Sequence, residues 1–138
     1  MNRFRPFAPA AAVVLLAALL AACADSIVRE LEPNNDPELV NEPDSLRFTA
    51  VDLENVNDKV TFTWTNTGTK ASVLHRTFIH HGYGILVIED GAGVQVDSTI
   101  LQYELDAETR VGTPGDWTVT LVLANARGRV DFTLLGEP

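Results

Sequence analysis

The residues best suited to metal chemistry are the histidines of the chain, which lie within seven positions of one another. They are His75, His80 and His81. Imidazoles at this density suit zinc or copper. Neighbouring His80 and His81 would point to opposite faces of a strand, so they can bind one ion together only from a loop. Their spacing matches no metal-ligand motif. We therefore favour a polar loop between strands, and keep a periplasmic metal-binding protein as the alternative.

Carboxylates form two further groups that could hold a cation. They are Asp52, Glu54 and Asp58, and Glu89, Asp90 and Asp97. Loops of β-sandwich domains bind calcium through such oxygens, but neither group has the spacing of an EF-hand loop. Because aspartate is common in turns, we interpret both groups as solvated turn residues.

The chain offers little for catalysis. It has no Gly-x-Ser-x-Gly elbow, no His-Glu-x-x-His pair and no phosphate-binding loop. Glu104 and Glu108 could be drawn as an acid and base, but any acidic domain offers such pairs. Tyr83 and Tyr103 could line a glycan or peptide site, although such tyrosines are more often ordinary strand residues. We expect a protein that is not an enzyme and has no cofactor.

The N-terminal segment has the parts of a secretory signal. Arg3 and Arg5 provide a basic start, and an apolar region runs from Ala8 to Leu20. This region is shorter than the ~20 residues that a membrane-spanning helix needs. The only cysteine closes the run Leu20-Ala21-Ala22-Cys23. That run resembles the lipobox of bacterial lipoproteins.

The lipobox resemblance implies a lipid anchor. Residues 1–22 would be removed as a signal peptide, and Cys23 would carry diacylglycerol on its thiol and an acyl group on its amine. Ala24 is not the aspartate that favours inner-membrane retention in proteobacterial lipoproteins. The resemblance thus implies the outer membrane, on either its periplasmic or its surface face. Two alternatives remain open, a released soluble protein with a stray cysteine and a buried structural cysteine.

Length and charge limit the classes of function. Of the 138 residues, 116 would remain after cleavage, which is enough for one domain. Without Arg3 and Arg5, eight basic residues face 19 acidic ones. This acidity argues against nucleic acid as a partner, and against attraction to anionic headgroups. A single cysteine cannot form an internal disulfide, so the fold must rest on its core.

The segment after the signal, residues 23–44, is predicted to be a tether. Residues 24–44 include seven acidic residues, one basic residue and three prolines. Few apolar side chains are available to offset the entropy of ordering. We expect this segment to stay mobile and to hold the domain off the bilayer.

From Ser45 to the end, the pattern is that of β strands. Runs rich in Val, Thr, Leu and aromatic residues cover residues 46–51, 60–66, 71–78, 84–89, 94–103, 116–123 and 129–134. Residues 54–58 and 124–128 are predicted turns, and residues 104–113 a polar loop. Seven short strands at this spacing predict a single antiparallel β-sandwich over residues 45–138, immunoglobulin-like or related.

Five aromatic side chains alternate with polar residues in these runs. They are Phe48, Phe62, Trp64, Trp117 and Phe132. We expect them to fill the space between the two layers and to dominate the stability of the core.

The closing segments, residues 114–121 and 128–134, resemble the terminal hairpin of bacterial β-sandwich modules. These include immunoglobulin-like, fibronectin-like and pre-peptidase C-terminal modules, and the layout resembles uncharacterised envelope lipoproteins. The resemblance implies a fold class and no ligand. We expect a lipid-anchored protein that serves binding, adhesion or envelope assembly. Its partners would be the membrane, through Cys23, and an envelope protein or glycan; an unpaired edge strand could accept a partner strand.

Overall fold

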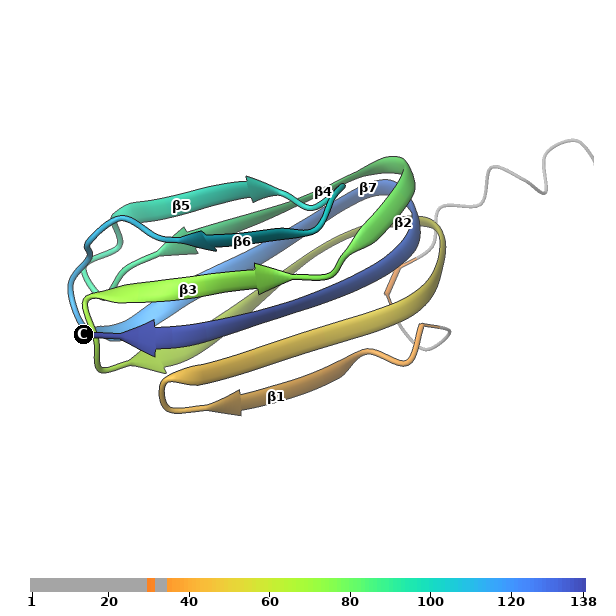
Figure 1. Cartoon of the computed structure of the whole chain (residues 1–138). Helices are drawn as coiled ribbons and strands as arrows, with labels where there is room; N and C mark the ends of the chain where they lie inside the picture. Colours follow the sequence, from red (N-terminus) through yellow and green to blue (C-terminus); the bar gives the residue numbers. More distant parts are fainter. Residues whose placement is uncertain (1–29, 32–34) are drawn as a thin grey trace, which may run out of the picture.

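The computed structural model of the chain describes residues 30–31 and 35–138 (Figure 1). The expected signal peptide, residues 1–22, and Cys23 lie outside these described residues. In the part that is described, no helix is long and apolar enough to cross a membrane.

Antiparallel β strands make up the described chain. They are β1 (Glu38–Glu42), β2 (Ser45–Asn66), β3 (Lys70–His75), β4 (Phe78–Glu89), β5 (Gln95–Ile100), β6 (Leu105–Glu108) and β7 (Gly115–Glu137). They pair in the order β1-β2-β7-β3-β6, and β4 pairs with both β7 and β5. The prediction of an all-β, sandwich-like fold is confirmed.

Two long strands, β2 and β7, fold this sheet back on itself. They pair antiparallel from Ser45 and Leu135 at one end to Asn66 and Gly115 at the other. The first half of β2 and the second half of β7 share a layer with β1, β3 and β6. Their other halves share the second layer with β4 and β5. Figure 1 shows both strands bending at the same end of the molecule, away from the C-terminus.

The bends lie near residues 54–58 and 124–128, where turns were predicted, but neither position ends a strand. β2 instead shifts register three times against β7 in this region. Positive φ angles occur at Asp52, Asn55, Asn125 and Gly128. Bulges and turns use the same residue types, because Asn, Asp and Gly tolerate the left-handed conformation. The prediction of turns at residues 54–58 and 124–128 was wrong, because the residue types found there suit a bulge within a strand as well as a turn.

Strand β1 lies inside the segment that was expected to be a tether. All of its side chains are exposed, so no alternation of burial marks it. It pairs with β2 along one edge. The Asn41 amide donates to the carbonyl of Thr63 at 2.8 Å, and the Trp64 indole donates to the carbonyl of Glu42 at 3.1 Å. The ordered domain therefore begins before Ser45.

Two further boundaries differ from the predicted ones. The run 71–78 is divided between β3 and β4, because β3 ends at His75. The polar loop predicted over residues 104–113 contains β6, which pairs with β3.

The predicted aromatic core is confirmed, since all five side chains are buried. The rings of Trp64 and Trp117 lie 5.9 Å apart at 82°, in an edge-to-face arrangement. Phe48 lies 5.3 Å from Phe62 and 5.6 Å from Phe132. Such pairs add about 0.5–1.5 kcal/mol beyond the area they bury. The packed core holds the two layers together beneath the bends.

Candidate functional site

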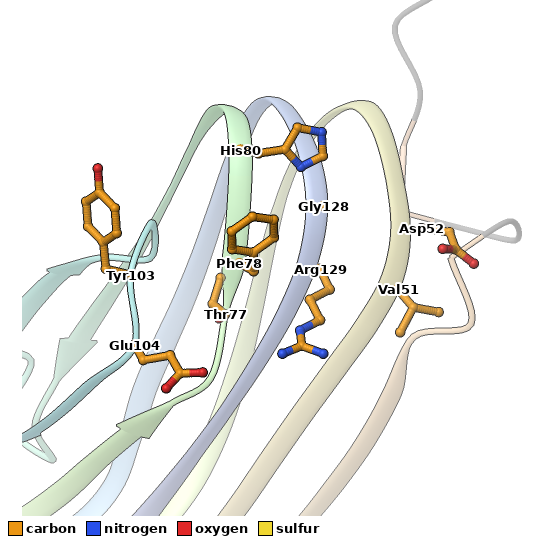
Figure 2. A pocket seen from close by; sticks show the side chains of 9 residues that line it. All are labelled: Val51, Asp52, Thr77, Phe78, His80, Tyr103, Glu104, Gly128 and Arg129. Carbon is orange, nitrogen blue, oxygen red and sulfur yellow. The ribbon is translucent and has the colours of Figure 1, made fainter.

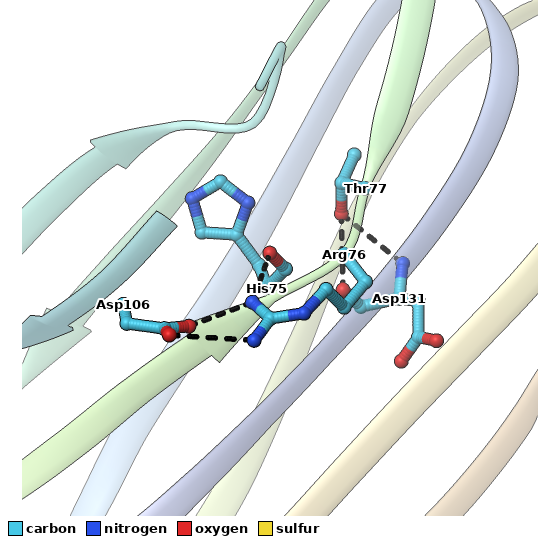
Figure 3. Close-up of polar contacts among 5 residues, drawn as sticks. All are labelled: His75, Arg76, Thr77, Asp106 and Asp131. Carbon is cyan, nitrogen blue, oxygen red and sulfur yellow. Dashed lines mark hydrogen bonds and ion pairs between the residues drawn. The ribbon is translucent and has the colours of Figure 1, made fainter. Parts of the chain in front are cut away.

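The structure places His75 inside the domain, at the end of β3. The side chain is fully buried, and within the described part neither ring nitrogen has a hydrogen-bond partner. Figure 3 shows the ring near the ion pair of Arg76 and Asp106, whose atoms approach to 2.6 Å. Burial lowers the pKa of His75, and the positive charge of Arg76 lowers it further. His75 is therefore a neutral core residue at neutral pH.

His80 and His81 lie on β4 and are exposed. β4 shifts register against β7 on both sides of His81. Among residues 30–31 and 35–138, no three His, Cys, Asp or Glu side chains are placed to hold a metal ion. The metal-binding alternative therefore has no supporting geometry in that part of the chain.

One aspartate from each acidic group that could hold a cation instead accepts hydrogen bonds from the backbone. The Asp90 carboxylate accepts hydrogen bonds from the N–H groups of Ala92, Val94 and Thr113 at 2.8–2.9 Å. These bonds, led by that from Thr113, lower the pKa of Asp90. The Asp58 carboxylate accepts from the N–H of Leu31 at 3.1 Å. These two aspartates fix a turn and the position of Leu31.

An open groove of about 690 Å³ lies at the end of the molecule where β2 and β7 bend. Its lining comes from four separate parts of the chain: Val51, Asp52, Thr77, Phe78, His80, Tyr103, Glu104, Gly128 and Arg129. Figure 2 shows Phe78 near the middle, Tyr103 and Glu104 on one flank, and Val51 and Asp52 on the other. The topology of the sheet assembles this surface, since no two of the four parts are adjacent in sequence.

Two aromatic rings in the groove are open to solvent. Phe78 is 59% exposed and Tyr103 is 81% exposed. The Phe78 ring lies 5.8 Å from the ring of His80. Tyr103 was a candidate from the sequence, and so was Tyr83, which is exposed on β4 but does not line the groove. Phe78 was not a candidate from the sequence, because it ends a run that alternates like a buried strand.

Three charged side chains of the groove are exposed. Within the described chain, Asp52, Glu104 and Arg129 form no side-chain hydrogen bond or ion pair. By contrast, Arg76 donates two hydrogen bonds to Asp106 just below the groove, which lower the pKa of that carboxyl. A guanidinium without an internal partner keeps all its donors for a ligand.

Close backbone packing fixes the shape of the groove. Gly128 has a φ of +130°, and a Cβ there would overlap the carbonyl oxygen of Phe78. The Thr77 hydroxyl lies 3.1 Å from the backbone nitrogen of Asp131, whose N–H donates to it, and 3.2 Å from the Asp131 carbonyl, to which it donates. β4 is thereby fastened to β7 directly beneath Phe78.

The N-terminal part of the described chain is joined to the rim of the groove. The Asn35 amide donates to the carbonyls of Val51 and Asp52 at 3.1 and 2.9 Å. In return, the N–H of Val51 donates to the carbonyl of Asn35 at 3.0 Å. Asn35 and Leu31 are only 4% and 3% exposed. Asn35 therefore attaches the N-terminal part of the described chain to this rim.

The arrangement can bind a ligand through stacking, apolar contact and charge. Exposed rings offer flat apolar surface, and Arg129 can donate to an anionic group. The chain matches no protein-family model and no curated protein sequence.

Proposed function

We propose that the protein is a lipid-anchored, non-enzymatic binding protein of the bacterial cell envelope that acts through the groove at Phe78 and Tyr103. One observation supports this most directly. The two exposed rings and Arg129, which has no partner among the described residues, lie in the groove to whose rim Asn35 attaches the N-terminal part of the described chain. A binding surface and this attachment thus occupy the same end of the molecule.

The anchor is supported by the sequence around Cys23. The single cysteine follows Leu20-Ala21-Ala22 at the end of the apolar region. Each acyl methylene buried in the bilayer contributes about 0.8 kcal/mol, so several chains hold a protein far more firmly than one. Ala24 after the cysteine favours the outer membrane as the destination.

Binding without catalysis is supported by the character of the groove. Phe78 and Arg129 lie side by side near its centre, and the carboxylates of Asp52 and Glu104 lie toward the flanks (Figure 2). Hydrophobic and aromatic contacts supply most of the affinity of such sites, while a few polar groups orient the ligand. The Thr77 hydroxyl, which lines the groove, is already hydrogen-bonded to the backbone of Asp131.

The test is the intact mass of the native protein, together with fractionation of the envelope. We expect the mass of residues 23–138 plus acyl groups, and recovery of the protein with the outer membrane. A Cys23→Ala variant serves as the control and should lose both the acyl mass and the membrane association. An unacylated wild-type protein recovered in the periplasm would refute the anchoring.

A further inference from the structure

The length of chain between the anchor and the domain restricts where the groove can lie. Eight residue steps separate Cys23 from Leu31, which is buried and bonded to Asp58. A fully extended chain gains at most ~3.6 Å per residue, so this span cannot exceed about 29 Å. Asn35 then attaches the chain to Val51 and Asp52 on the rim. An anchor at Cys23 would therefore keep the groove within a short distance of the bilayer.

The apolar side chains of the groove suit the surface of a bilayer. Val51, Phe78 and Tyr103 are 41%, 59% and 81% exposed, and all three line the groove. Tyrosine, such as Tyr103, and tryptophan are enriched at the level of the headgroups, where an apolar ring and a polar edge are both accommodated. Bringing these side chains against lipid would remove apolar surface from water.

The charges of the groove suit a headgroup that carries both signs. Arg129 can donate two parallel hydrogen bonds to a phosphate. Asp52 and Glu104 lie on opposite flanks of Phe78 and Arg129 in Figure 2, where they can receive a cationic group. The net charge of the chain is −9, so a purely anionic surface would repel it. A zwitterionic headgroup has the complementary pattern.

We propose that the groove docks on the bilayer that carries the anchor, and that it receives a zwitterionic phospholipid headgroup between Phe78, Arg129 and the flanking carboxylates. This inference rests on the anchoring of Cys23 in the proposed function. The anchor brings the groove to the surface, and docking then fixes the orientation of the domain on it. Tethering raises the effective concentration of headgroups, so a weak individual contact is sufficient.

The experiment replaces the bacterial anchor with a chemical one. Residues 23–138 are produced without acyl groups, and the Cys23 thiol is coupled to a maleimide lipid in vesicles. The vesicles contain either phosphatidylethanolamine with phosphatidylcholine, or phosphatidylglycerol. Hydroxyl-radical labelling followed by mass spectrometry reports the accessibility of each side chain. Since the tether is chemical, the result does not depend on whether bacteria acylate Cys23.

On zwitterionic vesicles we expect labelling of Phe78 and Tyr103 to fall about threefold or more, because a docked ring loses most of its exposed surface. Labelling of Val94 and Val111, which are 58% and 69% exposed outside the groove, should not change. On vesicles of phosphatidylglycerol, the protection of Phe78 and Tyr103 from labelling should be smaller. An Arg129→Gln variant should lose most of the protection, whereas Arg110→Gln, at an exposed arginine outside the groove, should keep it.

Three results would overturn the proposal. Equal labelling of Phe78 and Tyr103 in coupled and free protein would show that the groove does not meet the bilayer. Equal or greater protection on phosphatidylglycerol would exclude the zwitterionic headgroup. Protection by isolated envelope glycan or by a protein partner, but not by vesicles, would assign the groove to that occupant.

Discussion

At the scale of single residues, His75 combines complete burial with ring nitrogens that have no partner in the described chain. A buried donor or acceptor without a partner costs roughly 1–3 kcal/mol. Burial, and then Arg76, lowers its pKa below the ordinary value of 6.5, while Asp106, Asp97 and Glu104 oppose the shift. The unfolded chain therefore binds a proton more readily than the folded chain below about pH 6.5. Stability is lost as the pH falls through this range.

We expect His75→Leu to raise the free energy of unfolding by about 1 kcal/mol at pH 7.5, since an apolar side chain of similar size removes the unsatisfied nitrogens. This gain in the free energy of unfolding should be larger at pH 5, because the variant has no imidazole at position 75 to protonate. Urea unfolding, followed by the fluorescence of Trp64 and Trp117, measures both values. His81→Leu, at an exposed position, is the control and should change neither. A His75→Leu protein less stable than wild type at both pH values would contradict this account.

A second prediction at this scale concerns Asn35, whose amide joins the N-terminal chain to the carbonyls of Val51 and Asp52. Asn35→Ala should lower the free energy of unfolding by about 1–2 kcal/mol, because two hydrogen bonds of a buried side chain are lost. It should also speed proteolysis between Glu30 and Glu38. Asn41→Ala, which removes one bond from an exposed side chain, is the matched control and should have a smaller effect. Equal cleavage rates in the two variants would argue against the role of Asn35 as the attachment point.

At the scale of elements, the bends of β2 and β7 determine the groove. Gly128 lies in the bend of β7 with a φ of +130°, and a side chain there would meet the carbonyl of Phe78. Both the conformation and the lack of space require glycine.

Gly128→Ala should therefore destabilise the domain by about 2 kcal/mol or more, since strain and steric overlap add. Gly93→Ala is a matched control, because Gly93 also has a positive φ, +78°, but open space around its Cβ position. Gly93→Ala should lower the free energy of unfolding by about 1 kcal/mol, which is the cost of the backbone strain alone. Thermal unfolding of the two variants measures the difference. Equal losses of stability in Gly128→Ala and Gly93→Ala would show that the contact with Phe78 does not constrain the bend.

The sequence was informative about elements wherever one face of a strand is buried. Alternation predicted both halves of β2 and β7 correctly, and it predicted the aromatic core. It could not distinguish a bulge from a turn at Asn55 or Gly128, since both conformations use the same residues. It could not reveal β1, because every side chain of that edge strand is exposed.

The groove was less predictable than the core, because only the topology brings its residues together. Val51, Phe78, Tyr103 and Arg129 are each separated by more than twenty positions from the next. Tyr103 was identified as an exposed aromatic candidate, but nothing local connects it to Phe78 or Arg129. The histidine stretch was the most prominent chemical pattern in the sequence. The fold divides it between the interior and the surface, since β3 ends at His75 and β4 contains His80 and His81.

At the scale of the whole molecule, the sandwich has two distinct ends. One holds the bends, the groove and the attachment of Asn35 to its rim, and the C-terminus lies at the other (Figure 1). A protein anchored through Cys23 would present the first end to the membrane and the second to the surrounding envelope. This orientation follows from the short span between Cys23 and Leu31 together with the proposed docking of the groove.

The decisive measurement is hydrogen–deuterium exchange of the protein purified with the acyl groups proposed at Cys23, in vesicles of its own extracted lipids. The reference is the soluble Cys23→Ala protein under the same conditions. We predict slower exchange in residues 77–81, 101–104 and 126–129 of the acylated protein, and unchanged exchange in the turn at residues 90–94. The same exchange at both ends in the acylated and soluble proteins would contradict the proposed orientation.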